Sequence, residues 1–402
     1  MLSLEEAVER SLATATFLGS ETVSLGNATG RFTAATVNAK VSLPSFDNSA
    51  MDGYAVRICD LYGASPESPA ELKCIGIIPA GNHPTQSIEA GTCIRLFTGS
   101  PIPTNADAVI MQEDCSNDPN DDRNIRFSKP IKPWKNIRFK GEDIRENDRV
   151  VTTGKRLTTG TIGLLAATGH GSIEVGIRPK VGLVATGSEL VETTNELQAG
   201  EIYESNRSML CSLVTKANGI PNAYPIVPDS LEATTAAMKK AFAENDVVLT
   251  SGGVSVGDHD HVKPAIGRLG GSLNFWKIAV KPGKPFVLGQ VDGKSVFGLP
   301  GNPVSALVTY LLLVRPVLLK MQGASDLRLT KRIGRLEEKL VNRGDRRHFI
   351  RVTLDMDGIV KSAGGQRSHM LSSLAMANGL VDLPQNSSLA KGDLVEVLLV
   401  EC

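Results

Sequence analysis

The stretch Asp246-Val-Val-Leu-Thr-Ser-Gly-Gly-Val-Ser-Val-Gly-Asp-His-Asp260 decides the fold class of this chain of 402 residues. Residues 246–250 predict a strand buried on both faces, because its apolar residues do not alternate with polar ones. A glycine-rich turn follows the strand directly. Ligands of open parallel sheets bind beyond the carboxyl ends of the strands, so this turn marks a predicted ligand site.

Strands and helices alternate on both sides of this stretch. Apolar runs predict further strands, and segments with helical spacing of apolar residues predict the helices between them. The strands are expected at 181–185, 224–227 and 296–298, and the helices at 206–216, 231–244 and 303–319. Nearly continuous apolar strands that alternate with helices predict a parallel sheet covered by helices. We expect Asp229 and Glu232 to cap the helix at 231–244.

The N-terminal half follows a different pattern. Ser3 and Glu6 have the spacing of a capping box, which predicts a helix from Leu4. Residues 46–140 are rich in Pro, Gly, Asn and Asp and contain short β-like runs, so they predict a small β-rich domain. A second helix is expected over residues 160–168, between Thr158 and Gly169.

The C-terminal segment predicts a separate β domain. From Leu329 the helical spacing is lost, and residues 349–354 and 395–400 are predicted as strands between turn signals. The whole chain is therefore expected to be a multidomain protein of α/β plus β class.

The composition excludes several classes of protein. Lys and Arg (43) balance Asp and Glu (43), and aromatic residues make up 4 %, so no nucleic-acid partner is expected. Arg315 and Pro316 interrupt the longest apolar run, so no membrane span is expected. No leader segment is expected, because the first residues have neither a basic nor an apolar region, and the six cysteines form no CxxC pair. We expect a cytoplasmic protein with reduced thiols.

The turn after the central strand has the chemistry of a phosphate site. Glycine N–H groups and serine hydroxyls can surround an anion there. The donors are Gly252, Gly253, Ser251 and Ser255. Asp258 and Asp260 add carboxylates beside the phosphate, a combination that suits Mg²⁺. The alternative is a glycine-rich turn whose aspartate caps a helix.

Other strand ends carry carboxylates. Glu189 and Asp229 each follow a predicted strand, so together with Asp260 they could share one edge of the sheet. Three carboxylates at one edge predict a metal ion or a perturbed acid–base site. Asp229 taken alone equally suits a helix cap.

Cations and a helix start lie further along the chain. Leu299-Pro-Gly-Asn-Pro-Val-Ser305 predicts a helix start with Asn302 as the cap, and its free N–H groups can bind an oxyanion. A purely structural helix start is the alternative. Lys277 and the run Lys281-Pro-Gly-Lys-Pro285 supply cations on a stiff loop, for which a solvated basic loop is the alternative.

Seven motifs occur in one order, and together they resemble the MoeA-type molybdopterin molybdenumtransferases. They are Ser49-Ala-Met-Asp-Gly-Tyr-Ala55, Thr98-Gly-Ser-Pro-Ile-Pro103 with Ala106-Asp-Ala-Val109, Gly141-Glu-Asp-Ile144, Thr186-Gly-Ser-Glu189, Thr250-Ser-Gly-Gly-Val-Ser-Val-Gly257, Lys281-Pro-Gly-Lys-Pro285 and Leu299-Pro-Gly-Asn-Pro-Val-Ser305. The resemblance covers essentially residues 1–402. The stretch 365–379 also resembles the gephyrin and plant E-domain branch.

This resemblance implies a homodimer with four domains in each chain. They are a discontinuous, elongated N-terminal domain (1–45 and 141–176), an inserted β-rich domain (46–140), a parallel-sheet α/β molybdopterin-binding domain (177–328) and a C-terminal β-barrel-like domain (329–402). The upstream adenylyltransferase and molybdoenzyme chaperones are implied as further partners. The chain has a single Thr-Ser-Gly-Gly motif, so no fused adenylyltransferase is expected.

The implied reaction is the insertion of molybdenum from molybdate into adenylylated molybdopterin, with release of AMP and with Mg²⁺ as cofactor. The implied catalytic residues are Asp52, Asp143, Glu189, Asp229, Asp260, Lys277 and Lys281. The implied cofactor-binding residues are Thr98, Ser251, Gly252, Gly253, Ser255, Asp258, Pro300, Gly301, Asn302, Ser305, Arg351 and Ser373. The carboxylates Glu189, Asp229 and Asp260 would hold the metal. Asp52 and Thr98 would come from the partner subunit.

Two other functions remain open at this point. A stand-alone molybdopterin adenylyltransferase would use the same α/β pattern but is expected to be a much shorter chain. A gephyrin-like scaffold would use the same fold to bind receptor peptides but is expected to carry a long linker and an extra domain.

Molybdate is a dianion that needs cations and hydrogen-bond donors, and the basic residues above supply them.

Overall fold

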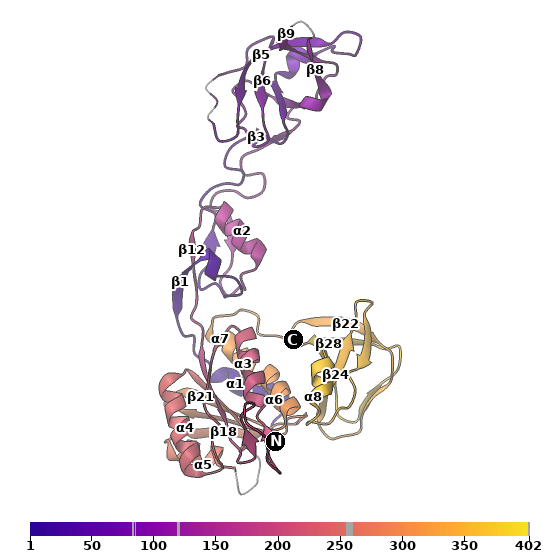
Figure 1. The fold of residues 1–402 in the computed structure, drawn as a ribbon. Helices are drawn as coiled ribbons and strands as arrows, with labels where there is room; N and C mark the ends of the chain where they lie inside the picture. Colours follow the sequence, from indigo (N-terminus) through magenta and orange to yellow (C-terminus); the bar gives the residue numbers. More distant parts are fainter. Residues whose placement is uncertain (83, 85, 119–120, 255–259, 401–402) are drawn as a thin grey trace. The chain divides into compact units, whose positions relative to one another are not determined.

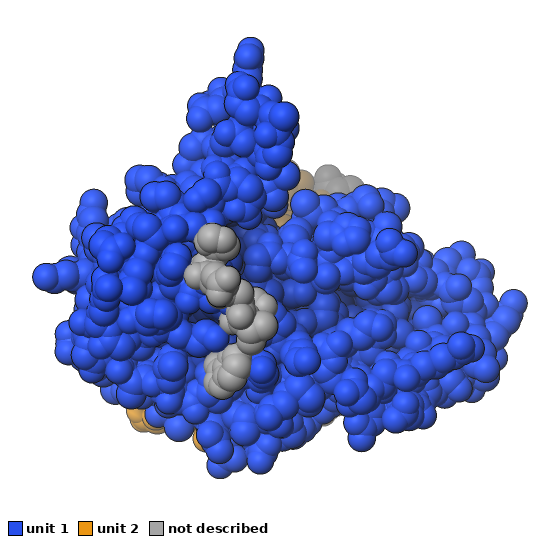
Figure 2. Space-filling view, turned by 90° about the horizontal axis from the view of Figure 1, so that it is seen from below, with its two compact units in different colours: residues 1–35, 153–157, 173–402 blue, residues 36–152, 158–172 orange. Residues whose placement is uncertain are grey.

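The computed structural model describes residues 1–82, 84, 86–118, 121–254 and 260–400. The chain forms two compact units. Unit 1 comprises residues 1–35, 153–157 and 173–402, and unit 2 comprises residues 36–152 and 158–172 (Figure 2).

Unit 1 is built around a six-stranded sheet. The strand order is β16 (Ile220–Ala223), β13 (Lys180–Ala185), β17 (Val247–Ser251), β21 (Lys294–Leu299), β20 (Pro285–Val291) and β18 (Ser272–Lys277). The first four strands are parallel. β20 and β18 are antiparallel to their neighbours, so the sheet is mixed and not purely parallel as predicted.

Helices cover both faces of this sheet (Figure 1). Val181 and Leu183 of β13 pack with residues of α3 (Asn206–Lys216), whereas Val184 packs with residues of α4 (Leu231–Glu244). α1 (Leu4–Ala13), α6 (Pro303–Thr309) and α7 (Arg315–Met321) share the α3 face, and α5 (Val262–Arg268) shares the α4 face. The strand alternation thus divides the apolar residues between two cores.

Most of the predicted elements of this region are confirmed, and two predictions are wrong. The strand expected at 224–227 lies at Ile220–Ala223 instead. Tyr224 N–H still donates to Leu183 O at 3.0 Å, but Pro225 has no N–H group with which to extend the ladder. The Ser230 side chain caps α4 by accepting from Ala233 N–H, and not Asp229 or Glu232.

The helix that contains the apolar run near residue 310 is continuous, although Arg315 and Pro316 interrupt the run in the sequence. α6, a π-helical turn (Tyr310–Val314) and α7 follow one another without a break over Pro303–Met321, which by length and composition could cross a membrane. However, 89 % of this helix is buried inside the protein, where its side chains fill the main core.

The C-terminal region of unit 1 is a closed β-barrel. Its strands are β24 (Arg347–Leu354), β25 (Ile359–Ser362), β22 (Lys331–Leu336), β28 (Leu394–Leu399) and β26 (Gly379–Leu383). The pairing of β24 with β26 closes the ring. A short ladder of β23 (Leu340–Asn342) with β27 (Ser387–Leu389) and the helix α8 (Leu371–Met376) complete the region. The predicted C-terminal β domain is confirmed.

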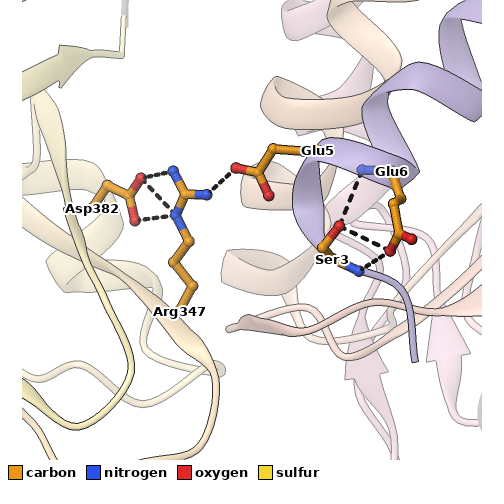
Figure 3. A network of polar contacts seen from close by, with 5 residues as sticks. All are labelled: Ser3, Glu5, Glu6, Arg347 and Asp382. Atoms are coloured by element: carbon orange, nitrogen blue, oxygen red, sulfur yellow. Dashed lines mark hydrogen bonds and ion pairs between the residues drawn. The ribbon is translucent and has the colours of Figure 1, made fainter.

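Three kinds of contact join the barrel to the α/β region. β19 (Val280–Lys281) pairs in parallel with β24. Phe349 of β24 and Leu374 of α8 lie in the same core as the α6 side chains. Arg347 of the barrel donates to Asp382 and to Glu5 of α1 (Figure 3).

The capping box predicted at the start of α1 is present. Ser3 Oγ accepts from Glu6 N–H at 3.2 Å, and Glu6 Oε2 accepts from Ser3 N–H at 2.9 Å (Figure 3). The Glu6 carboxylate has a lowered pKa because it accepts hydrogen bonds from the Ser3 N–H, the larger cause, and from Ser3 Oγ.

Unit 2 contains the predicted β-rich region. Its six-stranded sheet has the order β7 (Ala108–Met111), β4 (Gly53–Val56), β6 (Thr92–Leu96), β5 (Ala70–Ile78), β9 (Asp121–Phe127) and β8 (Cys115–Asp118). Two short ladders, β2 (Val37–Asn38) with β11 (Arg149–Val151) and β3 (Asn48–Ser49) with β10 (Ile137–Arg138), connect it to α2 (Thr159–Ala167). Thr158 caps α2 as the sequence indicates.

Two further two-stranded ladders complete the fold. β1 (Ser20–Ser24) pairs with β12 (Ser172–Gly176), and β14 (Leu190–Val191) pairs in parallel with β15 (Ile202–Tyr203).

Gly53 and Gly163 give a matched pair of substitutions in unit 2. A Cβ on Gly53 would lie 1.9 Å from Ile110 O, so Gly53→Ala forces β4 away from β7 and should cost about 1–3 kcal/mol. A Cβ on Gly163 in α2 meets nothing within 4 Å, so Gly163→Ala should stabilise by up to about 1 kcal/mol. Hydrogen–deuterium exchange of β4 and β7 should accelerate only in Gly53→Ala. Equal exchange in both variants would contradict this account.

Candidate functional site

The glycine-rich turn after β17 joins three strand ends. Ser251 O accepts from Thr186 N–H after β13 at 3.0 Å, and Gly252 N–H donates to Leu299 O of β21 at 3.2 Å. Gly252 has φ +89°, and a Cβ there would lie 2.6 Å from Thr186 O. Only glycine allows this approach, so the turn lies at the common carboxyl edge of the parallel strands, as predicted.

Asn206, at the start of α3, ties two loops of this edge together. Its Nδ2 donates to Ser251 Oγ at 2.8 Å and to Gly301 O at 2.7 Å. The side chain is buried, with the residue 7 % exposed. Sequence reasoning missed Asn206, because an asparagine in the first turn of a helix ordinarily indicates only a cap.

Buried polar atoms without protein partners gather at this edge. Within the described residues, Asn206 Oδ1, Thr186 Oγ1 and Thr250 Oγ1 make no hydrogen bond. Buried polar groups are ordinarily paired, so these three atoms are suited to contact a bound ligand.

Two of the predicted carboxylates lie on neighbouring loops of the same edge. Ser188 N–H donates to Asp229 Oδ2 at 3.0 Å, and Asp229 N–H donates to Ser188 Oγ at 3.1 Å. The Glu189 carboxylate folds back over Gly187, where a Cβ would lie 2.7 Å from Glu189 Oε2. The structure therefore places Glu189 and Asp229 on adjoining loops of this edge.

The third predicted metal ligand, Asp260, is half-buried just before α5. Ser255 and Asp258 lie outside the described residues. Among the residues that the structure describes, no group of three or more His, Cys, Asp or Glu side chains is placed to hold a metal ion. Two carboxylates with substrate phosphates still suit Mg²⁺, which usually takes one or two protein carboxylates and keeps several waters.

The predicted lysines differ in their surroundings. Lys281 lies in β19 opposite His348 of β24 and is exposed, whereas Lys277 ends β18 and is half-buried. The lysine loop packs on α6, because a Cβ on Gly283 would lie 2.6 Å from Thr309 Cγ2. Lys281 is therefore the lysine that the fold directs to the barrel.

Arg351 is a fully buried cation in the barrel wall. Its Nε donates to Ser373 Oγ at 3.1 Å, and its Nη2 donates to the carbonyl oxygens of Gly365 and Arg367 at 2.5 and 3.2 Å. Within the described part of the chain its Nη1 has no partner. Burial lowers the pKa of Arg351, yet a guanidinium stays charged in proteins. A buried cation bonded only to neutral groups is suited to an anion.

His348 is a second group that sequence reasoning did not single out. It is 6 % exposed, and neither ring nitrogen has a hydrogen-bond partner among the described residues. Burial, followed by the charges of Lys281, Arg351 and Arg346, lowers the pKa of His348 to about 4. The imidazole is therefore neutral at physiological pH and offers one N–H donor.

The start of α6 separates the carboxylate edge from these cations. Asn302 occupies the cap position, but its side chain makes no capping hydrogen bond. Val304 N–H donates to Ser368 O at 3.2 Å, so one of the helix donors expected to face an oxyanion is occupied by a carbonyl. Ser305 is buried. Gly301, in the loop that leads into α6 after Pro300, lies beside the turn, because a Cβ built on it would be 3.9 Å from Gly252 Cα.

Three predicted site residues belong to unit 2. Asp52 Oδ1 accepts from Thr98 N–H at 2.7 Å and from Thr98 Oγ1 at 2.9 Å. These bonds, the backbone one first, lower the pKa of Asp52 and keep its carboxylate ionised. Asp143 is exposed, and its backbone N–H donates to Leu43 O at 3.1 Å.

Comparison with known proteins gives one consistent family. Residues 2–169 match the model of the MoeA N-terminal region (domain I and II), residues 182–320 match a probable molybdopterin binding domain, and residues 334–400 match the MoeA C-terminal region (domain IV).

Similar proteins span the whole chain. A molybdopterin molybdenumtransferase of Haemophilus influenzae is 37 % identical over 99 % of this chain and 98 % of its own length. Molybdopterin molybdenumtransferase 2 of Mycobacterium tuberculosis is 38 % identical over 94 % of this chain and 92 % of its own length. The solved molybdopterin biosynthesis moeA protein of Pyrococcus horikoshii is 32 % identical, covers both chains fully and has a TM-score of 0.86.

Asn206→Ala tests whether one side chain holds the two loops. The change removes both Nδ2 bonds and leaves Gly301 O without this donor, which should cost about 1–3 kcal/mol. Hydrogen–deuterium exchange of residues 247–254 and 299–305 should accelerate, whereas Asn195→Ala on an exposed loop should leave it unchanged. Unaltered exchange in Asn206→Ala would show that the loops hold their positions without it.

Proposed function

This chain belongs to the MoeA family, and we propose that it is a molybdopterin molybdenumtransferase that inserts molybdenum from molybdate into adenylylated molybdopterin and releases AMP. The observation that carries the proposal is the separation of charge around α6. The start of α6 touches the glycine-rich turn at Gly252, and its Val304 N–H bonds to Ser368 O of the barrel loop. Buried Arg351 bonds to that loop and has no carboxylate partner among the described residues.

The phosphate side of the proposed site uses the carboxyl edge of the sheet. N–H groups of the turn at Gly252 and Gly253, with Ser251, receive the pyrophosphate of the adenylylated pterin. Asn206 positions this turn against the loop at Gly301. Ser255, Asp258 and Asn302 belong to the same proposal, and the first two lie outside the described residues.

Glu189, Asp229 and Asp260 are proposed to hold Mg²⁺ beside the pyrophosphate. Mg²⁺, when bound, neutralises charge that develops on the phosphate oxygens during cleavage. The fit rests on chemistry and position, because carboxylates on neighbouring loops border a turn suited to phosphate. The Ser188 N–H keeps the Asp229 carboxylate oriented toward this edge.

Molybdate is proposed to lie on the cationic side. The charges come from Lys281 and Arg351, with Lys277 nearer the sheet, and Ser305, Ser373 and His348 supply neutral donors. A carboxylate 4 Å from the dianion would repel it by about 1 kcal/mol per charge pair even in bulk water. The two substrates therefore need different sides of the site.

Asp52 and Thr98 are proposed to act across a homodimer, and Asp143 is proposed to join the carboxylates beside Mg²⁺. Asp52 stays ionised because Thr98 donates two hydrogen bonds to it, and it lies in unit 2. A cytoplasmic homodimer in which unit 2 of one chain completes the site of the other accounts for a prepared carboxylate outside the α/β region.

The deciding experiment is reconstitution of a cofactor-free molybdoenzyme by this protein, adenylylated molybdopterin and low molybdate. The proposal requires enzyme activity and AMP release that depend on all three components and on Mg²⁺. ATP consumption with free molybdopterin would instead identify an adenylyltransferase. Failure of insertion with correctly folded protein would overturn the proposal.

Lys281→Ala should raise the molybdate concentration needed for insertion about tenfold or more, because a lost charge-assisted hydrogen bond costs about 1.5–3 kcal/mol. Lys284→Ala is the matched control, since Lys284 is an exposed lysine of the same loop. The measurement is a molybdate titration of cofactor formation, with pterin retention followed in parallel. An unchanged molybdate requirement together with lost pterin binding would assign Lys281 to the pterin phosphate.

Mixed dimers test the shared site. Asp52→Asn and Asp260→Asn chains should each be inactive as homodimers, but mixing them should restore part of the activity, because one site of each heterodimer is intact. Subunit exchange is verified by mass spectrometry of differently tagged chains. Complete exchange without recovery would place Asp52 and Asp260 in the same chain's site or outside it.

A further inference from the structure

Unit 1 contains a cavity that none of the proposed site residues lines. Its volume is about 340 Å³, which lies at the lower end of the range of small-molecule pockets. The walls come from α3, the π-helical turn, α7, the segment at 154–156 and the loop at 325–330.

The floor of this cavity is apolar. Leu213 of α3, Leu311 of the π-helical turn and Leu319 of α7 line it. Tyr310 also lines it and is fully buried, and its hydroxyl donates to Leu213 O at 2.9 Å. The tyrosine therefore contributes its ring and leaves no free hydroxyl in the floor.

The π-helical turn widens the helix where it meets the cavity. Pro316 has no N–H group to bond the carbonyl of Leu312, which accounts for the local change of hydrogen bonding. Single π-helical turns inside α-helices occur frequently at functional sites.

The wall at Gly154 is fixed by close packing. Gly154 N–H donates to Thr33 O at 2.7 Å, and Gly154 O accepts from Ser325 N–H at 2.9 Å. Gly154 has φ +77°, and a Cβ there would lie 2.8 Å from Gly323 O. The cavity is therefore preformed. Binding of a ligand requires little ordering of the chain, so little binding free energy is lost to it.

The rim of the cavity is strongly basic. The cationic residues that line it are Lys155, Arg156, Lys216, Arg315 and Arg328, and among the described lining residues Asp326 is the single acidic one. Arg328 Nε and Nη2 donate to the two Asp326 oxygens at 2.9 and 3.0 Å, which neutralises that carboxylate. Arg315 Nη1 donates to Leu327 O at 3.0 Å. This partner is a neutral carbonyl, so the bond holds the loop and leaves the charge of Arg315 in place. Because the whole chain has no net charge, this excess of cations is local.

We propose that this cavity binds a compact organic phosphate ester, with the phosphate at the basic rim and the apolar body on the floor. Cations from separate chain segments match the three oxygens of a phosphate dianion, and arginine and lysine are the residues that recognise it. The apolar floor gives the organic part a surface that inorganic phosphate could not use. The proposal does not depend on molybdenum insertion.

Pyridoxal 5′-phosphate is a suitable probe, because its aldehyde condenses with a lysine amine and borohydride reduces the imine to a stable secondary amine. The full chain is treated with limiting reagent, reduced, digested and mapped by mass spectrometry. Lys155 or Lys216 should be modified about tenfold or more faster than Lys339, which is also exposed but does not line the cavity.

Two competitors separate the phosphate from the organic body. Pyridoxine 5′-phosphate has no aldehyde and should protect the cavity lysines, whereas pyridoxine without phosphate should protect at least about tenfold less well. Thr330→Trp, at an exposed lining position, should abolish the preference while all cations remain. Equal labelling of Lys155, Lys216 and Lys339, or equal protection by both competitors, would overturn the proposal without any bearing on cofactor insertion.

Discussion

A ladder of two residue pairs joins the lysine loop to the barrel strand that carries Arg351. Val280 and Lys281 of β19 pair in parallel with Arg347 and His348 of β24. Hydrophobic packing between the barrel and the α/β region is non-directional, so the shared core around Phe349 could not by itself fix which side chains become neighbours. The register does so, because each ladder bond assigns one residue to one partner. The proposed binding of one anion by the lysine loop and the buried arginine of the barrel therefore requires this pairing.

The same fold places carboxylates at the edge of the sheet and a buried cation in the barrel wall. The carboxylates lie where parallel strands end, at loops that glycine allows to approach closely. Arg351 lies in the barrel wall, where burial of an unpaired guanidinium would be costly. Ser373 and the carbonyls of Gly365 and Arg367 reduce this cost without cancelling the charge. A carboxylate partner would stabilise the arginine more and would remove its capacity to attract an oxyanion.

Local signals in the sequence predicted the local structure well. The capping box of Ser3 and Glu6, the helices α3 and α4 and the buried strand β17 follow from spacing and composition alone. By contrast, β20 runs antiparallel to β21 and β18 runs antiparallel to β20, an arrangement that depends on long-range pairing that no short pattern encodes. The roles of Asn206 and His348 were missed for the same reason. Each depends on a neighbour from another part of the chain, Gly301 for the first and Lys281 for the second.

The start of α6 shows how a structural contact limits a functional one. A helix start offers free N–H groups and a partial positive charge, which favour an anion. Here Val304 N–H is bonded to Ser368 O of the loop that encloses Arg351, and Pro303 has no N–H to offer. The start of α6 therefore connects the α/β region to the barrel loop. An oxyanion on this side must depend chiefly on the side-chain cations and hydroxyls, whose positions that same contact helps to fix.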